Sequence, residues 1–413
     1  MSNRVVVTGM GALTPIGNSV EEFFKNAKNG VNGIDDITIF SAEKYKSFLA
    51  GELKNFNIED YMDRREAKRM DRFCQLAVIA TDEAIKDSGL DMEKIDKDRL
   101  GVIVGSGIGG LQTIESEKEK LLNKGPGRVS PFMIPMIIEN IAAGNIAIRY
   151  GCKGICTSVV TACATGTNCI GEAFRNIKYG NEDIIIAGGT EATITPLAVA
   201  GFGNLTALSG SKDKDRASIP FDKERNGFII GEGAGILIVE SLDHALARNA
   251  KIYGEIVGYG ANCDAYHITS PDPEGKGASK CMERAINEAG IEKEEISYIN
   301  AHGTGTPYND KFETQAIKNL FGEYAYKIPV NSTKSMTGHL LGAAGAIESI
   351  VCIKSLEEGF IHPTIGLKVK DEDCDLDYVP NEGRKCDLKY ALSNSLGFGG
   401  HNATLIFKRW EGR

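Results

Sequence analysis

The chain lacks the patterns that mark membrane, secreted and nucleic-acid-binding proteins. Its longest apolar stretch, residues 131–148, is interrupted by Glu139, Asn140 and Asn145, so a membrane span is not expected. The apolar run at its N-terminus, Val5–Val7, is too short for the core of a signal peptide. A net charge of −9 argues against nucleic acid as the main partner. We therefore expect a cytoplasmic protein with no membrane and no nucleic-acid partner.

The sequence also lacks the motifs of common metal and cofactor sites. Its ten cysteines show no repeated spacing, and the nearest to a pair, Cys152 and Cys156, has no second pair to complete a zinc site. Reduced thiols of a cytosolic protein are the better interpretation. HExxH and P-loop motifs are absent, and Gly105–Gly110 lacks the spacing of a dinucleotide loop. We expect no bound metal and no resident cofactor.

Apolar, β-branched runs that end near glycine alternate with amphipathic segments along the chain. Continuous apolar strands separated by helices are typical of parallel-dominated sheets that are covered on both faces. We therefore predict an α/β fold. The expected strands are 4–11, 100–107, 183–189, 235–240, 252–260, 296–303, 328–331 and 390–395, and the helices between them include 74–88, 278–289 and 312–320.

A weak internal duplication divides the chain. Cys163 opens a small-residue helix that ends near Gly180, and a segment from Lys334 leads into a second Gly- and Ala-rich helix over 341–356. Each helix follows a short extended segment. We place the boundary near 245–251 and predict two halves without a linker, packed as one compact unit. The N-terminal half is 1–250 and the C-terminal half is 251–413.

Cys163 is the candidate nucleophile. Residues 158–162 are predicted to form a strand, and residues 164–168 to begin a helix. At such a junction the helix dipole and the free N–H groups stabilise a thiolate, and the same N–H groups can bind a developing oxyanion. A buried structural cysteine is the alternative. Cys169 lies deeper in the same helix and lacks this placement.

Two histidines lie beside glycines and complete the candidate site. His302 follows an expected strand and precedes the turn 303–306, where a side chain faces a cleft. His339 follows Lys334 by five residues, and Glu348 on the next helix can pair with Lys334. For that pair, a buried ion pair that fixes the core is the alternative. One cysteine with two histidines indicates covalent catalysis, in which a thiolate accepts an acyl group and imidazoles handle protons or charge.

One basic segment runs against the acidic balance of the chain. Arg65, Lys68, Arg69 and Arg72 follow helical spacing and would form a basic stripe. From spacing alone, a solvated helix face is the plainer interpretation.

Four motifs together resemble the signatures of the β-ketoacyl-[acyl-carrier-protein] synthases. They appear in the family's order and span nearly the whole chain, and within the family the chain is most similar to the type II elongating enzymes of bacterial fatty acid synthesis. The resemblance implies the thiolase fold, a duplicated five-layered α-β-α-β-α sandwich, and a homodimer. The motifs are Thr161–Gly166, Ala301–Thr306, Lys334–His339 and Gly397–Gly400.

The resemblance also implies a two-stage decarboxylative Claisen condensation. Cys163 takes the acyl chain from acyl carrier protein, with an oxyanion hole made by the backbone N–H groups of Cys163 and Phe398. Malonyl-carrier protein then loses carbon dioxide while His302 and His339 donate hydrogen bonds to its thioester oxygen. The enolate attacks the acyl-enzyme and releases a β-ketoacyl product. Neutral imidazoles suit this role better than lysine.

Further roles come with the resemblance. Thr304, Thr306 and Thr269 would hold the phosphopantetheine arm, which arrives on the carrier protein and so is no resident cofactor. Phe398 would gate the site from a mobile glycine-rich loop, and Ile108 would gate the acyl pocket.

The charged residues acquire roles in the same way. Lys334 and Glu348 would form an ion pair that supports His339. Arg65, Lys68 and Arg69 would dock the acidic carrier protein by charge complementarity.

Two positions depart from the family pattern. Thr206 stands where a related enzyme carries an arginine that contacts the carrier, so the docking surface is not a straight copy. His401 replaces the usual threonine after Gly-Phe-Gly-Gly, next to the gate. A titratable ring there can alter the loop or its pH response, but a tolerated substitution is the plainer interpretation.

Four related activities compete with this reading. A thiolase would use a second cysteine near the C-terminus, and residues 393–402 contain none. An initiating synthase would pair cysteine with one histidine and an asparagine, which His339 argues against. A non-catalytic chain-length-factor-like partner subunit would lack Cys163. A polyketide-type ketosynthase shares every motif and stays open, although Ile108 and the lack of fused domains favour fatty acid elongation.

Overall fold

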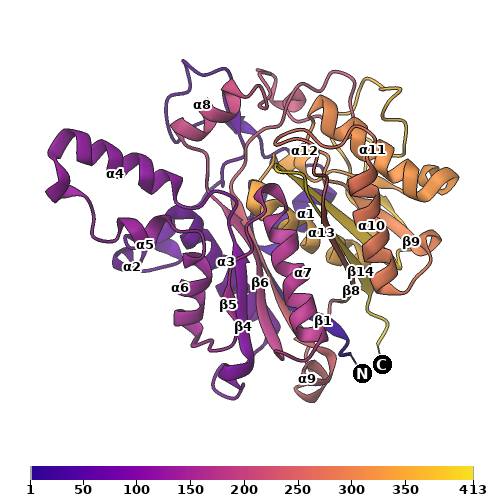
Figure 1. The fold of residues 1–413 in the computed structure, drawn as a ribbon, viewed down its shortest axis with the longest axis horizontal. Coiled ribbons are helices and arrows are strands. Elements are labelled where there is room, and N and C mark those ends of the chain that lie inside the picture. Colours follow the sequence, from indigo (N-terminus) through magenta and orange to yellow (C-terminus); the bar gives the residue numbers. More distant parts are fainter. Residues whose placement is uncertain (1, 413) are drawn as a thin grey trace.

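The computed structural model describes residues 2–412, which alternate between strands and helices (Figure 1). None of the helices within that range combines the length and apolarity needed to cross a membrane. The main sheet contains β1 Val5–Leu13, β4 Leu100–Gly105, β5 Cys156–Thr157, β6 Ile184–Glu191, β7 Gly233–Ser241, β8 Gly254–Cys263, β9 Ile296–Asn300, β10 Val330–Asn331, β13 Tyr390–Gly397 and β14 His401–Arg409. Two short ladders pair β2 (Asp35–Asp36) with β3 (Leu49–Ala50) and β11 (Phe360–Ile361) with β12 (Arg384–Lys385).

Helices cover the faces of this sheet. They are α1 Val20–Lys28, α2 Arg64–Ala67, α3 Arg72–Ser88, α4 Leu111–Lys124, α5 Met133–Ile137, α6 Ile141–Tyr150, α7 Thr165–Lys178, α8 Pro196–Asn204, α9 Leu242–Ala247, α10 Lys276–Ala289, α11 Pro307–Phe321, α12 Lys334–Thr337 and α13 Ala344–Glu358.

The strand order repeats one pattern twice. It runs β10-β9-β13-β14-β8 and then β1-β7-β6-β4-β5, so each half places its strands in the order third, second, fourth, fifth, first, mirrored about the middle. The halves meet where β1 and β8 pair antiparallel, from Val5 opposite Ile256 to Val7 opposite Gly254. Only this short ladder joins them, so the sheet consists of two five-stranded half-sheets, and the predicted duplication is confirmed.

The helices complete five layers. α7 and α13 pack together between the half-sheets and contact both of them, within the largest apolar cluster. α3 and α6 cover the outer face of the N-terminal half-sheet, and α10 and α11 cover that of the C-terminal one (Figure 1). The α-β-α-β-α sandwich predicted for this chain is therefore observed. The exact division into 1–250 and 251–413 stays a prediction.

The expectation of parallel-dominated sheets is wrong. β4 pairs parallel with β5 and β6, and β9 with β10 and β13, but β7, β1, β8 and β14 form antiparallel pairs with their neighbours. Helices cover both faces of each half-sheet, so its strands are buried on both faces whatever their direction. Continuous apolar runs therefore report burial and not strand direction.

The predicted strand over 158–162 is also wrong. β5 ends at Thr157, and the chain then runs without a ladder into a 3-10 turn, Ala162–Ala164, that leads into α7. α13 begins in the same way after the 3-10 turn Leu341–Ala343. The first residue of each turn is left-handed, with φ of 50° at Ala162 and 45° at Leu341. Neither helix has a side-chain cap, so N–H groups at both starts are free for other partners.

Candidate active site

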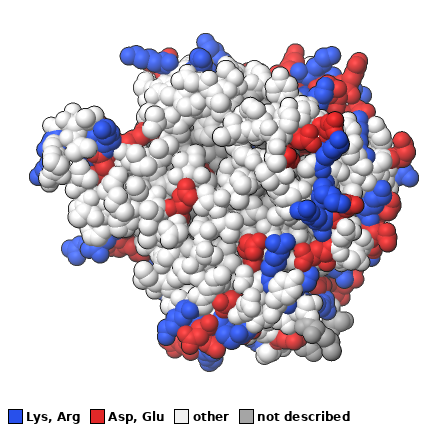
Figure 2. Space-filling model, in the orientation of Figure 1, with Lys and Arg blue, Asp and Glu red and all other residues white. Residues whose placement is uncertain are grey.

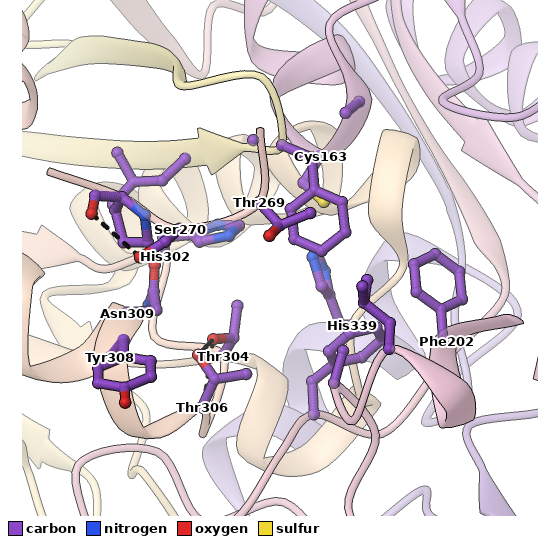
Figure 3. A pocket seen from close by; sticks show the side chains of 18 of the residues that line it. Cys163, Phe202, Thr269, Ser270, His302, Thr304, Thr306, Tyr308, Asn309 and His339 are labelled. Carbon is purple, nitrogen blue, oxygen red and sulfur yellow. Dashed lines mark hydrogen bonds between the residues drawn. The ribbon is translucent and has the colours of Figure 1, made fainter. Parts of the chain in front are cut away.

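A cavity of about 570 Å³ lies where the two halves meet (Figure 3). The N-terminal half contributes Ile108 and Cys163 to its lining, and the C-terminal half contributes His302, His339 and Phe398. Residues from both ends of the sequence thus converge on one space, because the halves pack through α7 and α13.

Cys163 lies in the middle of the 3-10 turn that precedes α7 and lines the cavity. Burial raises the pKa of its thiol to about 12, while the Lys334 charge and the N–H groups of Phe398 and Cys163 act in the opposite direction. Burial therefore outweighs the helix terminus in setting the pKa of this thiol. At neutral pH the free site holds a thiol, with two N–H groups gathered at the sulfur.

His302 follows β9 and is nearly inaccessible to solvent, with 3% of its surface exposed. The turn that begins at His302 is held by Glu313, because the backbone N–H groups of His302 and Gly303 each donate to the Glu313 carboxylate at 2.8 Å. The sequence analysis missed Glu313. A signal was available, since Glu313 is a carboxylate on the buried face of an amphipathic helix.

His339 lies beside His302, with ring centroids 5.2 Å apart and planes at 83°. The Leu341 N–H donates to Nδ1 of His339 at 3.3 Å. In the neutral ring the proton is therefore on Nε2, which has no other partner within residues 2–412. Burial, and the charge of Lys334, hold the pKa of both histidines well below its usual range. Both rings face the cavity (Figure 3), and at neutral pH both are uncharged.

Lys334 and Glu348 form a buried ion pair, with Nζ and Oε1 2.5 Å apart and side chains 1% and 0% exposed. Burial raises the pKa of Glu348 to about 7, against the lowering effect of Lys334. The positive charge of Lys334 lowers the pKa of His302, His339 and Cys163.

The predicted arm-binding and gate residues line the same cavity. Thr304 and Thr306 are hydrogen-bonded through their hydroxyls at 3.0 Å, and Thr269 faces them across the cavity (Figure 3). The loop that carries Phe398 is bound to the segment that carries Thr269, since the Gly399 N–H donates to the Ile268 carbonyl at 2.7 Å. No motif in the sequence pointed to other lining residues, which include Phe202, Ser270, Tyr308 and Asn309.

The basic residues lie outside the cavity, and their predicted continuous helix is wrong. α2 ends at Ala67, and α3 starts again at Arg72 because Asp71 caps it by accepting from the Phe73 N–H. Arg72 turns inward and pairs with Glu232 at 2.6 Å.

The three residues assigned to docking remain at the surface. Arg65, Lys68 and Arg69 are all exposed, and the guanidinium of Arg69 lies 5.4 Å from the ring centroid of Phe132.

Within residues 2–412 all ten cysteines are free thiols, and no cluster of three or more His, Cys, Asp or Glu side chains has the arrangement of a metal site.

Comparison with known proteins identifies relatives over the full length. Residues 2–245 match the family model described as Beta-ketoacyl synthase, N-terminal domain, and residues 253–368 match Beta-ketoacyl synthase, C-terminal domain. A 3-oxoacyl-[acyl-carrier-protein] synthase 2 of Staphylococcus aureus is 56% identical over 410 residues, which cover 99% of each chain. One of Synechocystis is 53% identical over 409 residues, 99% of this chain and 98% of that protein.

Solved structures agree with the sequence relatives. The ishigamide ketosynthase/chain length factor is 37% identical with a TM-score of 0.93, covering 99% of this chain and 100% of that chain. A ketosynthase solved in complex with its type II polyketide synthase acyl-carrier protein is 36% identical with a TM-score of 0.91 and the same coverage. With its duplicated sandwich and its Cys-His-His cavity, the chain belongs to the β-ketoacyl synthase family.

Proposed function

We propose that this chain catalyses the decarboxylative Claisen condensation of acyl-[acyl-carrier-protein] with malonyl-[acyl-carrier-protein], the elongation step of fatty acid biosynthesis. One observation carries the proposal: Cys163, His302 and His339 share a single cavity in a chain that is 56% identical, end to end, to a 3-oxoacyl-[acyl-carrier-protein] synthase 2. Such an enzyme is an acyltransferase and needs no resident cofactor.

The first stage moves the acyl group to Cys163. The sulfur attacks the thioester carbonyl of the acyl carrier, and the N–H groups of Cys163 and Phe398 bind the oxyanion that forms. The carrier thiol leaves with the proton of Cys163, so no net charge is created in the cavity. This exchange suits a site in which burial keeps the thiol protonated at rest.

The second stage uses the two neutral imidazoles. Malonyl thioester binds with its arm along Thr304, Thr306 and Thr269, and its carbonyl oxygen accepts hydrogen bonds from His302 and His339. The bond to the carboxylate breaks, carbon dioxide leaves, and the electron pair becomes an enolate. The enolate carbon attacks the acyl carbonyl on Cys163, the sulfur leaves as a thiolate that takes up a proton from water, and β-ketoacyl-carrier is released.

Two alternatives are weighed against this function. A chain-length-factor-like partner subunit would lack the nucleophile, and Cys163 is present and lines the cavity. A polyketide-type ketosynthase has the same site, but the polyketide relatives are 36% and 37% identical, against 56% and 53% for the 3-oxoacyl synthases. Identity therefore favours fatty acid elongation.

We also propose that the chain acts as a homodimer in the cytoplasm, with acyl carrier protein docking at Arg65, Lys68 and Arg69. The dimer proposal is supported by β5, which is one of the two edge strands of the main sheet. Around it, Figure 2 shows a broad face with few charged side chains. Large apolar side chains exposed in this region are Phe132, Ile134, Ile138, Ile148 and Val160.

Intact-protein mass spectrometry tests the function directly. The purified chain is mixed with acyl carrier protein that bears a fatty acyl group, and the mass of the chain is measured before and after malonyl-carrier protein is added. We expect an acyl adduct on the wild type, none on Cys163→Ala, and loss of the adduct on addition of malonyl carrier. A folded chain that acquires no adduct would disprove the proposal.

A further inference from the structure

Glu191, the last residue of β6, is a fully buried carboxylate behind the active-site wall. Its side chain is 0% exposed, it does not line the cavity, and it has no lysine, arginine or histidine partner within residues 2–412. Burying a carboxylate without a cation costs stability unless hydrogen bonds compensate. A group that is costly to bury is retained where its hydrogen bonds serve a purpose beyond stability.

The hydrogen bonds of Glu191 reach two different parts of the active site. On one side, the Ser106 hydroxyl donates to Oε1 at 2.8 Å and the Gly107 N–H donates to Oε2 at 2.9 Å. Ser106 Oγ in turn accepts from the Gly109 N–H at 2.9 Å, so the carboxylate anchors the loop that presents Ile108. On the other side, the Gly342 N–H donates to the same Oε2 at 3.0 Å.

Gly342 holds the position in its half that Cys163 holds in the other. Both are the middle residue of a 3-10 turn that starts left-handed and leads into a central helix. A Cβ on Gly342 would lie 2.3 Å from the Gly107 nitrogen and 2.9 Å from Glu191 Oε2. The position equivalent to the nucleophile therefore has no room for a side chain, and its free N–H binds the carboxylate.

The same turn orients His339. The Leu341 N–H donates to Nδ1 of His339, and the next peptide N–H along the chain, that of Gly342, donates to Glu191. A displacement of the turn would therefore move the partner of the imidazole and the partner of the carboxylate together. On its other side, Glu191 fixes a loop whose residues Gly107 and Ile108 line the cavity next to Cys163.

We propose that Glu191 is a positioning residue of the condensation: its carboxylate binds the Ile108 loop to the Leu341–Ala343 turn, and thereby sets both the acyl entrance and the orientation of His339. The inference rests on the proposed function. It assigns Glu191 no contact with substrate and no part in proton transfer.

Three variants separate the contact of Glu191 with the Ile108 loop from its contact with the Leu341–Ala343 turn. Glu191→Leu keeps the approximate size but leaves both N–H groups unpaired, and we expect the kcat of malonyl-carrier decarboxylation and the rate of Cys163 acylation each to fall about 10-fold, as for buried donors left unsatisfied. KM for malonyl carrier should change little, since Thr304 and Thr306 are untouched. Ser106→Ala loosens only the loop, and should reduce acylation more than decarboxylation. Glu191→Gln retains one oxygen for the two N–H groups and should restore most of both rates.

Thr190→Val is the matched control. Thr190 is the neighbouring buried residue of β6, but its hydroxyl donates at 2.7 Å to the Phe73 carbonyl on the opposite face of the sheet. Thr190→Val removes a buried hydrogen bond without changing the Ile108 loop or the Leu341–Ala343 turn. The rates of acylation and decarboxylation should therefore stay at the wild-type level. Thermal melts and circular dichroism establish that each variant is folded at the assay temperature. If Glu191→Leu does not fold, Ser106→Ala and Glu191→Gln carry the test.

The outcomes distinguish this inference from the proposed function. Wild-type rates in Glu191→Leu, or equal losses in Thr190→Val at equal loss of Tm, would overturn the positioning role while leaving condensation intact. If Ser106→Ala slowed both half-reactions equally, the positioning role would also be overturned. A wild-type chain that neither accepts an acyl group nor decarboxylates malonyl carrier would overturn the proposed function, and this inference with it.

Discussion

The ring of Phe228 packs edge-on against the ring of His339, with centroids 5.3 Å apart and planes at 78°. Phe228 in turn contacts Phe202, which lies beside Phe398, the residue predicted to act as the gate, at 6.4 Å between ring centroids. An aromatic row thus leads from the gate to the histidine pair and excludes water from one side of His339. This apolar contact helps to explain why burial dominates the titration of the ring.

The rate of malonyl decarboxylation should be flat above pH 6.5 and fall only below it. The pKa of His302 and His339 is lowered from 6.5 in the folded chain, so both rings are already neutral at pH 6.5. The unfolded chain binds these protons first, so the stability contributed by the neutral rings is present above pH 6.5 and declines as pH falls towards the folded pKa. Initial rates measured on folded protein between about pH 5 and 8 test this. A midpoint at the ordinary histidine pKa would contradict it.

Lys334→Met should destabilise the chain more than the double variant Lys334→Met/Glu348→Gln. Removing one partner of a buried ion pair leaves a charge uncompensated and costs about 3–5 kcal/mol, whereas replacing both partners is close to neutral. Chemical denaturation measures the free energy of unfolding of the three chains. The single variant should also shift the acid limit of decarboxylation to higher pH, because Lys334 lowers the pKa of both histidines. Equal destabilisation of the single and double variants would be the contrary result.

Alkylation of free Cys163 by iodoacetamide should accelerate continuously from pH 7 to beyond pH 9. Burial raises the pKa of this thiol to about 12, so the thiolate fraction grows about tenfold per pH unit over that range. Peptide mass spectrometry of the Cys163 peptide gives the rate at each pH. A plateau by pH 8 would show that the helix terminus prevails over burial. Lys334→Met should slow the reaction further, since the lysine lowers this pKa.

Reversing the charge at Lys68 and Arg69 should weaken binding of acyl carrier protein about 10-fold at low salt, because surface charges steer and orient an acidic partner. Both residues are exposed and lie outside the cavity, so decarboxylation of a small malonyl thioester should not change. Lys385→Glu, an exposed residue on β12, is the control. Apparent affinities measured at two salt concentrations decide the matter, and an unchanged affinity would refute the docking assignment.

Gly399→Ala should slow acyl transfer by constraining the gate loop. Gly399 has φ of 86°, which disfavours alanine, and a Cβ there would lie 3.2 Å from the His401 ring. Gly399→Ala/His401→Thr removes the ring contact but not the backbone strain, so it should recover part of the rate. Gly127→Ala, with no atom within 4 Å of its Cβ position, is the neutral control. Acylation rates measured by rapid quench and mass spectrometry test the expected ranking of these variants. Full activity of Gly399→Ala would contradict the prediction.

The alternation of strands and helices and the duplication were predicted from residue patterns, whereas the five layers were predicted from the family resemblance. Strands buried on both faces leave apolar runs, and an N–H-rich turn before a helix requires small residues, so segments such as 183–189 and the Cys163 turn are visible in one dimension. The same burial hides strand direction, which is why the predicted strands β7 and β8 were not recognised as antiparallel, and β14 was not predicted as a strand. The break at Asp71 was missed because charge spacing alone does not reveal a helix cap.

The pKa values of the site residues were harder to predict than which residues line the site. The thiol pKa of Cys163 depends on how much solvent the folded halves exclude, which no local motif encodes. Glu191 and Glu313 were missed for a related reason. Each is a carboxylate that accepts hydrogen bonds from backbone N–H groups, and backbone groups leave no trace in the identity of residues.

A fold built by repeating one unit offers every feature twice, a place for a nucleophile included. In this chain the two equivalent turns carry different residues at their middle position. One turn carries the sulfur of Cys163, whereas the other carries Gly342 and is occupied by the chain's own carboxylate. Under the proposed function, the repeat has thereby become a division of labour between the halves, in which one half holds the growing chain and the other prepares the unit that extends it.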